Sequence, residues 1–266
     1  MNFLAELDQR VLLASGAMGT ELMRRGCLLE RPLDELNLTR PNLVHDLCRD
    51  YVEAGAQVIK TNTFLANAVH LSEAGLHGQV RDINREGARI ARDAAKGAFV
   101  AGSVGPTGFV PGTDLYPVYE EQCSALAEGG CDLLLLETFT SDEDLIYAYF
   151  AARATGLPVV CQMATGDGRL ITRFAGATGG PRADVLGVNC VPAEAALEAV
   201  GRIGDFTTLP RSAFPDGGTA DHPVPEADFA EGLRRLVRAG ARLVGGCCGA
   251  GPDHIRAAAA VLGMRR

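Results

Sequence analysis

Residues 243–249 read Leu-Val-Gly-Gly-Cys-Cys-Gly, an apolar run that ends in two adjacent cysteines among glycines. Successive side chains of a strand point to opposite faces. The thiols of Cys247 and Cys248 can therefore converge only if the backbone leaves strand geometry there, which the glycines permit at little steric cost. A similar run, 185–190, ends in Cys190. Three thiolates that meet at nearby strand ends form a zinc site with one open position.

Two other interpretations of the adjacent cysteines stay open at this stage. Cysteine is a common small hydrophobic residue of protein cores, so both thiols could pack against apolar neighbours. An adjacent pair can also act as a redox device. The other five cysteines fall in a loop, in helices and in strand interiors, and we expect packing or surface roles for them: Cys27, Cys48, Cys123, Cys131 and Cys161.

The composition is that of an ordinary globular protein, with 47% hydrophobic and 22% charged residues in a chain of 266. A net charge of -8 argues against nucleic acid or an anionic membrane as a main partner. Eight cysteines without a signal peptide predict a reducing compartment, the cytoplasm. No apolar stretch reaches the length of about 18 residues that a membrane span requires.

Apolar runs alternate with helical patterns along the chain. Eight of the runs are strand candidates: 11–15, 58–64, 99–103, 132–139, 158–163, 185–190, 211–216 and 243–249. The helical patterns lie at 41–54, 80–95, 118–128, 141–154, 193–200, 226–239 and 252–262. Short apolar runs of this kind suit strands that are buried on both faces of a parallel sheet.

Eight strand–helix units in about 250 residues predict an α/β fold of the (β/α)8 or TIM barrel type. No shift in composition marks a boundary, so we expect a single domain over residues 1–266. The alternative is a doubly wound open sheet, which is disfavoured because no G-x-G-x-x-G follows the first strand. The connection 164–183 is short and rich in glycine, so we expect little helix there.

Polar residues stand where the predicted strands end, and in a barrel this edge carries the active site. Glu137 directly follows four leucines, and we expect it to be a ligand at the barrel mouth rather than a charge that faces the helices. Asn62 ends the second strand. The turn 16–19 offers backbone N–H groups that could hold a carboxylate. Lys60 lies within the second strand, and a snorkelling or paired lysine is favoured there over a Schiff-base lysine.

Several short motifs, in order and with fitting spacing, resemble the homocysteine S-methyltransferase family, most closely the homocysteine-binding module of cobalamin-dependent methionine synthase. They are GAMGTEL (16–22), DELN (34–37), TNTF (61–64), GPTG (105–108), ETF (137–139), GVNC (187–190) and GGCCG (245–249). The resemblance implies a (β/α)8 barrel in which zinc is bound by Cys190, Cys247 and Cys248. It also implies that the amino acid part of homocysteine is held at the mouth. The substrate-binding residues expected there are Ser15, Gly16, Ala17, Met18, Asn62, Glu137 and Asp216.

The chain departs from the family pattern at three places. Family members usually have an aspartate where this chain has Ser15, and that aspartate helps to bind the substrate ammonium. Glu137 is then the main anionic partner, so we expect weaker ammonium recognition or a different thiol as substrate. Asp216 stands where the methionine synthase module tends to have asparagine, and we hypothesise that it occupies the open zinc position when substrate is absent. The segment between Gln162 and Cys190 is short for the family, so we expect a truncated βα unit.

The leading functional hypothesis is a zinc-dependent methyltransferase that converts homocysteine to methionine, with the zinc activating the substrate thiolate. The candidate methyl donors are S-methylmethionine, betaine, and methylcobalamin carried by a partner domain or subunit. We recognise no cobalamin-binding module in this chain, which is either a whole protein or a module of a longer one. The alternatives are a divergent member that acts on another thiol, a non-catalytic zinc- or thiol-binding protein, and an aldolase with a Lys60 Schiff base.

Overall fold

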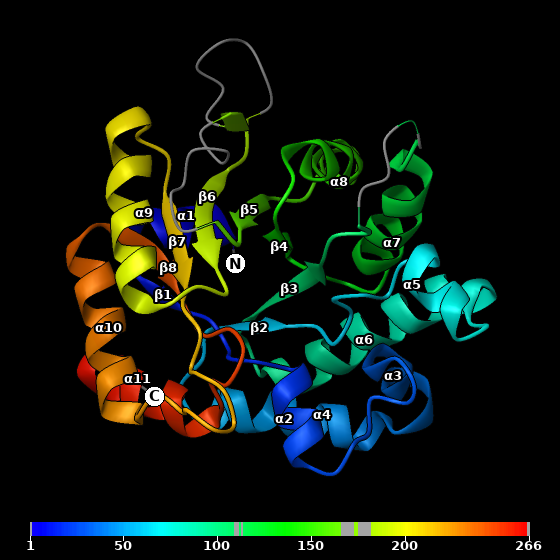
Figure 1. Cartoon of the computed structure of the whole chain (residues 1–266), viewed down its shortest axis with the longest axis horizontal. Helices are drawn as coiled ribbons and strands as arrows, with labels where there is room; N and C mark the ends of the chain where they lie inside the picture. Colours follow the sequence, from blue (N-terminus) through cyan, green and yellow to red (C-terminus); the bar gives the residue numbers. More distant parts are fainter. Residues whose placement is uncertain (1, 109–111, 113, 166–172, 175–181, 265–266) are drawn as a thin grey trace.

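Eight parallel strands form the centre of the molecule in a computed structural model that describes residues 2–108, 112, 114–165, 173–174 and 182–264 (Figure 1). The strands are β1 (Leu12–Leu13), β2 (Val58–Lys60), β3 (Phe99–Val104), β4 (Leu133–Phe139), β5 (Val159–Met163), β6 (Val185–Asn189), β7 (Arg211–Phe214) and β8 (Ala241–Val244). Each strand from β2 to β7 pairs with the next, and β8 pairs with β1. The ring closes through a parallel bridge between Ala14 and Val58, beside which the Ser15 N–H donates to the Val58 carbonyl at 2.8 Å. The predicted (β/α)8 barrel is confirmed.

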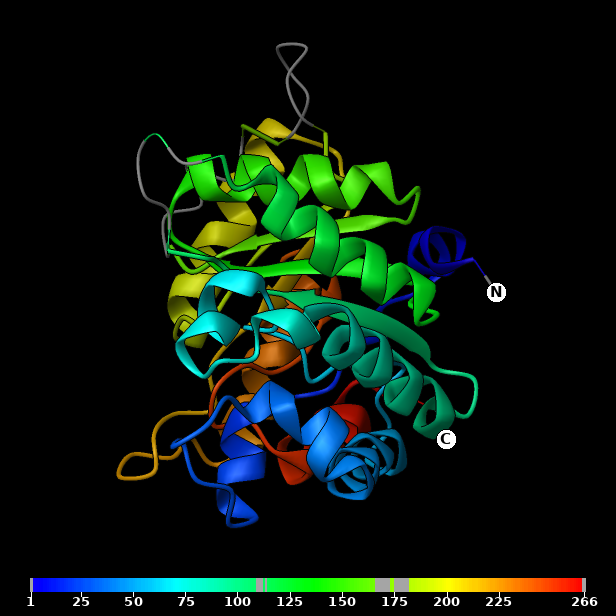
Figure 2. The ribbon, with the colours of Figure 1, turned by 90° about the vertical axis from the view of Figure 1, so that its right-hand side faces the viewer.

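The helices surround the strands (Figures 1 and 2). They are α1 (Phe3–Gln9), α2 (Gly19–Arg24), α3 (Leu36–Thr39), α4 (Pro41–Glu53), α5 (Ala68–Glu73), α6 (Val80–Ala95), α7 (Tyr116–Glu128), α8 (Asp142–Ala154), α9 (Ala193–Phe206), α10 (Glu226–Arg238) and α11 (Pro252–Val261), with 3-10 turns η1 (Leu33–Glu35) and η2 (His77–Gln79). Local sequence sets several ends. Pro41 suits the first turn of α4, and the Ser141 side chain accepts the Asp144 N–H at the start of α8. No described helix is long and apolar enough to cross a membrane.

The structure differs from the sequence prediction around the short helices. Residues 24–39 show no helical pattern in the sequence, yet they contain η1 and α3, and α2 begins at Gly19. These helices are too short to show a helical period in the sequence. The helix predicted to end at residue 200 continues to Phe206, where Gly204 leaves room for the Arg211 guanidinium that donates to the Val200 carbonyl. Most of the connection 164–183 lies outside the described residues.

The barrel interior explains why polar residues collect at one end. Along β4, Leu133 and Leu135 face the interior core, and the next residue in this alternation is Glu137. Along β2, Val58 faces the same core, and Lys60 follows it by two positions. The apolar interior layers therefore give way to charged side chains only at the carboxyl ends of the strands.

The N-terminal helix covers the opposite end of the barrel. The Phe3 and Leu7 side chains of α1 are buried in the interior core. The Arg242 guanidinium, from β8, donates to the Leu7 carbonyl at 2.8 and 3.0 Å. Because this end is filled with apolar side chains, the carboxyl ends of the strands offer the accessible side of the barrel.

Candidate metal and substrate site

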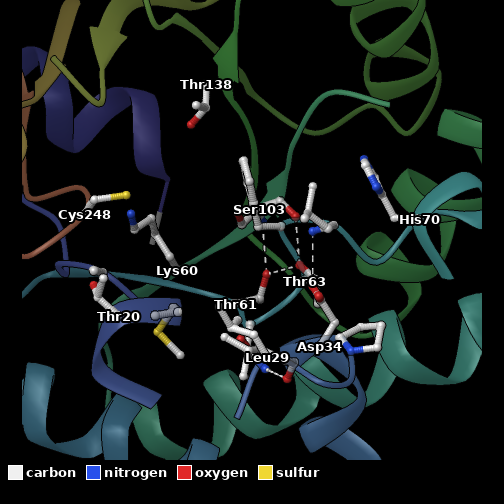
Figure 3. Close-up of a pocket in the computed structure, with 18 of the residues that line it drawn as sticks. Thr20, Leu29, Asp34, Lys60, Thr61, Thr63, His70, Ser103, Thr138 and Cys248 are labelled. Carbon is white, nitrogen blue, oxygen red and sulfur yellow. Dashed lines mark hydrogen bonds between the residues drawn. The ribbon is translucent and has the colours of Figure 1, made fainter. Parts of the chain in front are cut away.

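A cavity of about 600 Å³ opens at the carboxyl ends of the strands (Figure 3). Its walls come from the segments that follow β1, β2, β4, β6 and β8, and from residues 29–34. We define its inner end by seven lining residues: Lys60, Ser103, Glu137, Thr138, Cys190, Cys247 and Cys248. Asp34 and His70 lie on the other side of the cavity from Cys248 and Lys60 in Figure 3.

Three thiols meet at the inner end. The Sγ atoms of Cys190, Cys247 and Cys248 all lie within 4.8 Å of one another. The Cys190 thiol donates to the Cys248 sulfur at 3.6 Å. Cys247 is buried, Cys190 is half-buried and Cys248 is exposed, so the cluster is supported by the core on one side and accessible from the cavity on the other. All eight cysteines are free thiols.

The backbone leaves strand geometry before the adjacent cysteines, as their convergence requires. Strand β8 ends at Val244, and Gly249 has a φ of +80°, where a Cβ would lie 2.2 Å from the Gly218 carbonyl oxygen. Gly245 and Gly246 serve a different purpose from the one the sequence suggested. They give room to the Ala14 and Ala250 side chains, which a Cβ would approach to 2.8 and 2.5 Å.

The thiol cluster fits a divalent cation. Hydrogen bonds from the Cys190 and Cys247 thiols lower the pKa of Cys248 to about 3. Hydrogen bonds with the Cys247 and Cys248 thiols, burial and the nearby thiolate charge together raise the pKa of Cys190 well above its ordinary value. Ionisation of all three sulfurs therefore needs a compensating positive charge. Three thiolates with one position left open form the donor set of a zinc site that can accept a substrate.

Asn189 makes three hydrogen bonds beside the thiol cluster. Its side-chain oxygen accepts the Thr138 N–H at 2.8 Å, and its amide nitrogen donates to the Thr138 hydroxyl at 2.7 Å and to the Cys247 sulfur at 3.6 Å. Thr138 and Cys190 have φ values of +68° and +56°, which are costly for non-glycine residues. Such backbone strain is concentrated at functional sites, and the Asn189 bonds hold the strained ends of β4 and β6 together.

Glu137 is paired at the inner end. Its Oε1 accepts the Ser103 hydroxyl at 2.6 Å, and its Oε2 lies 3.4 Å from the Lys60 Nζ. Lys60 also donates to the Gly246 carbonyl at 3.2 Å. Both charged side chains are nearly inaccessible to solvent, at 5% and 6% exposure. Of the two favoured interpretations of Lys60, snorkelling and paired, the paired lysine is confirmed.

The pairing argues against a Schiff base at Lys60. Burial lowers the pKa of the amino group, but the nearby Glu137 and Cys247 charges outweigh burial and raise it above the ordinary value of 10.5. A Schiff-base lysine must be deprotonated to attack a carbonyl. The ion pair therefore keeps the Lys60 amino group protonated, and a protonated amine cannot attack a carbonyl.

The structure brings four of the seven predicted substrate residues to the cavity: Ala17, Met18, Asn62 and Glu137. It places Ser15, Gly16 and Asp216 outside the lining. The Ser15 hydroxyl is fully buried and accepts the Lys60 N–H at 3.0 Å, and a Cβ on Gly16 would lie 2.0 Å from the Ala250 carbonyl oxygen.

Three of these residues have structural partners that bear on the predicted roles. The Ala17 N–H donates to the Ala250 carbonyl at 2.9 Å, so it is not free to cradle a carboxylate. The Asn62 side chain donates to the Leu33 carbonyl at 2.8 Å and thereby ties residues 29–34 to β2. The Asp216 carboxylate accepts the Gly218 N–H at 3.2 Å and is not part of the thiol group. Its occupancy of an open metal position stays a prediction.

Sequence reasoning did not assign roles to Asn189, Thr138 or Ser103. Each stands next to, or at, the end of a strand, and the motif GVNC already placed Asn189 beside Cys190. The signal that could have identified Asn189 is its position as a polar residue at a strand end, directly before a proposed metal ligand. Ser103 was recognisable as the polar end of the third strand, but its partner 34 residues away was not.

Asp34 is a second buried carboxylate in the cavity wall. Its Oδ1 accepts the Leu65 N–H at 3.1 Å. Burial raises its pKa from 3.8 to about 6, an effect that the backbone hydrogen bonds only partly oppose. Between these values the native carboxyl is protonated while the unfolded one is ionised, so the native state holds more protons. The free energy of unfolding should therefore fall by about 3 kcal/mol as pH rises from about 4 to about 6.

An Asp34→Asn variant should lack this part of the pH dependence, because its side chain does not titrate and can still accept the Leu65 N–H. We expect the stability difference between the variant and the wild type to shift by about 3 kcal/mol in favour of the variant over this range. Urea unfolding of both proteins at a series of pH values measures the difference. Parallel curves would show that Asp34 titrates normally.

The chain is similar to known proteins over almost its whole length. A family model for homocysteine S-methyltransferase matches residues 12–262. The chain belongs to the homocysteine S-methyltransferase family. Methionine synthases of Mycobacterium tuberculosis and Mycobacterium leprae are each 32% identical to it over 301 aligned positions. The match takes in 98% of this chain but 25% of each relative, so the chain spans about a quarter of their length.

Solved structures of a homocysteine methyltransferase share the fold over 96% of this chain. The homocysteine methyltransferase MmuM from Escherichia coli, in its oxidised form, has a TM-score of 0.82 at 28% identity, covering 96% of this chain and 97% of that one. Its metallated form has a TM-score of 0.80, with 96% and 98% covered. The predicted family is confirmed, and the members of this family are methyltransferases. That the relative exists in a metallated form agrees with the donor set described above.

Proposed function

We propose that this chain is a one-domain, zinc-dependent thiol methyltransferase that transfers a methyl group to homocysteine and produces methionine. The observation that carries the proposal is the convergence of three thiols, from the ends of β6 and β8, at the inner end of a cavity in a homocysteine S-methyltransferase barrel. Cys190, Cys247 and Cys248 would hold the zinc. Bound there, zinc would lower the pKa of a substrate thiol and so supply a nucleophile at neutral pH.

The residues of the chain itself perform the remaining tasks. Asn189 and the strained strand ends keep the three ligands in one place, so binding of the metal needs little rearrangement. Glu137 and Lys60 place opposite charges beside the thiols, where an amino acid head group would lie. Cavity walls made of residues 29–34 and Ala17 and Met18 would exclude water from the substrate sulfur. A reducing compartment, such as the cytoplasm, would keep the thiols available.

The methyl donor has to reach the open side of the cavity. A cavity of about 600 Å³ has room for a second small molecule beside homocysteine, which suits S-methylmethionine or betaine. The similarity to part of the methionine synthases supports methylcobalamin carried by another domain or subunit instead. We therefore propose homocysteine as the acceptor and leave the choice among these three donors to experiment.

One experiment tests the proposed function directly. Homocysteine is titrated into zinc-loaded protein, and proton release and heat are recorded in buffers of different ionisation enthalpy. We expect about one proton to be released per bound homocysteine, because the thiol becomes a thiolate on binding. Methyl transfer from each donor is then assayed. Binding without proton release, or no methionine from any donor, would contradict the proposal.

A further inference from the structure

Lys60 is an unusual residue at the inner end of the cavity. It is one of two lysines in the chain, and its side chain is 5% exposed. The barrel alternation directs it inward, since it follows Val58 by two positions. Its amino group lies 3.2 Å from the Gly246 carbonyl, the residue before the first of the two adjacent cysteines. Figure 3 shows the Lys60 amino group pointing toward the Cys248 sulfur.

The bonds of Lys60 leave one donor for a ligand. An ammonium group has three N–H donors. One faces Glu137 Oε2 and one faces the Gly246 carbonyl, and the Phe214 ring centroid lies 5.5 Å away. Lys60 lines the cavity, so its remaining donor is within reach of a bound molecule. In a site this buried, a charge-assisted hydrogen bond is stronger than in water.

The carboxylate at the inner end is already paired with a cation. Glu137 is the sole carboxylate among the seven residues that define this end, and both its oxygens already have donors, Ser103 and Lys60. Ser15 is neutral, and its hydroxyl is occupied by the backbone of Lys60. A second ammonium beside Glu137 would also stand close to the Lys60 charge and be repelled by it. A carboxylate at the remaining Lys60 donor would instead form a charge-assisted hydrogen bond.

We infer that Lys60 binds the acidic group of the thiol substrate, so that the site selects thiols with a carboxylate a short carbon chain away from the sulfur. Homocysteine belongs to this class, and a thiol acid without an amino group belongs to it equally. The short chain follows because Lys60 and the three cysteines line the same cavity, and Lys60 donates to the carbonyl of the residue directly before Cys247. The inference rests on the proposed function and names the part of the substrate that decides specificity.

Two analogues of homocysteine separate the contributions of its head group. Mercaptobutanoate lacks the amino group, and mercaptopropylamine lacks the carboxylate. Each is titrated into zinc-loaded protein, with proton release as the sign that the sulfur has bound as a thiolate. We expect mercaptobutanoate to bind within about threefold of homocysteine. Loss of the carboxylate should weaken binding on the order of thirtyfold, the range for a hydrogen bond to a charged group.

Variants at Lys60 assign the effect to this residue. Lys60→Gln should weaken the two acidic thiols on the order of thirtyfold and leave mercaptopropylamine unchanged or tighter. Lys60→Arg should keep the preference for acids, since it keeps the cation. Lys96→Gln is the matched control, because Lys96 is the other lysine and is exposed at the end of α6. If Lys60→Gln folds poorly, the double variant Lys60→Gln/Glu137→Gln removes the pair without leaving an unpaired charge.

The outcomes distinguish the inference from the proposed function. Proton release with all three thiols, without a preference for the acids, would overturn the role of Lys60 and leave the methyltransferase proposal standing. A preference for acids that survives in Lys60→Gln and in the double variant would overturn it as well. Absence of proton release with every thiol would overturn both.

Discussion

Replacing Cys247 with alanine is expected to remove the metal and methyl transfer together while the barrel stays folded. Cys247 is the buried member of the thiol cluster, and the Asn189 side chain holds it in place. Loss of groups that merely orient a ligand costs 10- to 100-fold in metal affinity, so loss of a ligand should cost more than about 100-fold. Metal analysis after dialysis and an assay of methyl transfer measure the two effects.

A matched control separates metal binding from packing. Cys161→Ala removes the same side chain from β5, where it is fully buried in the core between strands and helices. We expect a similar, modest loss of stability, about 1 kcal/mol, with full metal content and full activity. A Cys247→Ala protein that retains a full metal complement and its activity would contradict the assignment of the three cysteines as ligands.

Much of the fold could be predicted because the strands are buried on both faces. Runs such as Leu133 to Leu136 have no solvent-exposed face, so they stand out from the amphipathic helices around them. The positions of the polar residues at the strand ends followed from the same pattern. The polar residues that lie near the thiols could therefore be predicted from the sequence as strand-end residues, although their contacts could not.

The pairings within the site could not be predicted in the same way. Lys60 and Glu137 are separated by 77 positions, and their contact depends on both facing the interior at the same height. The sequence showed a strand-end carboxylate and a lysine, without showing that one neutralises the other. Ser15 illustrates the converse. Its position after the first strand suggested a substrate contact, whereas the backbone N–H of Lys60 takes up its hydroxyl.

The helices near the cavity were missed for a related reason. The segment that includes η1 and α3 is held by side-chain contacts with distant residues, such as the bond from the Asn62 amide to the Leu33 carbonyl. The Asn37 amide donates in turn to the Asn62 carbonyl at 2.8 Å. Buried polar contacts of this kind stabilise short helical turns that have no apolar period of their own.

Glu137→Gln is expected to cause the largest loss of stability of any single change considered, because it leaves the Lys60 charge buried without its partner. Breaking one side of a buried ion pair costs about 3–5 kcal/mol. The Gly246 carbonyl remains as a neutral acceptor for Lys60, so the barrel should still fold. Urea unfolding of metal-free protein measures the loss, since bound metal would otherwise add its own stabilisation.

The double variant Lys60→Met/Glu137→Gln should recover most of that loss. Methionine fills a similar volume without a charge, and glutamine can still accept the Ser103 hydroxyl. Proteins in which a buried ion pair is replaced by neutral side chains are often as stable as the original. We therefore expect the stability of the double variant to lie within about 1 kcal/mol of that of the wild type. A double variant as unstable as Glu137→Gln would mean that the shapes of the two side chains, and not their charges, determine the stability of this part of the core. Recovery of stability in the double variant would instead show that the pairing adds little net stability to the barrel, so that Lys60 serves the site through its charge.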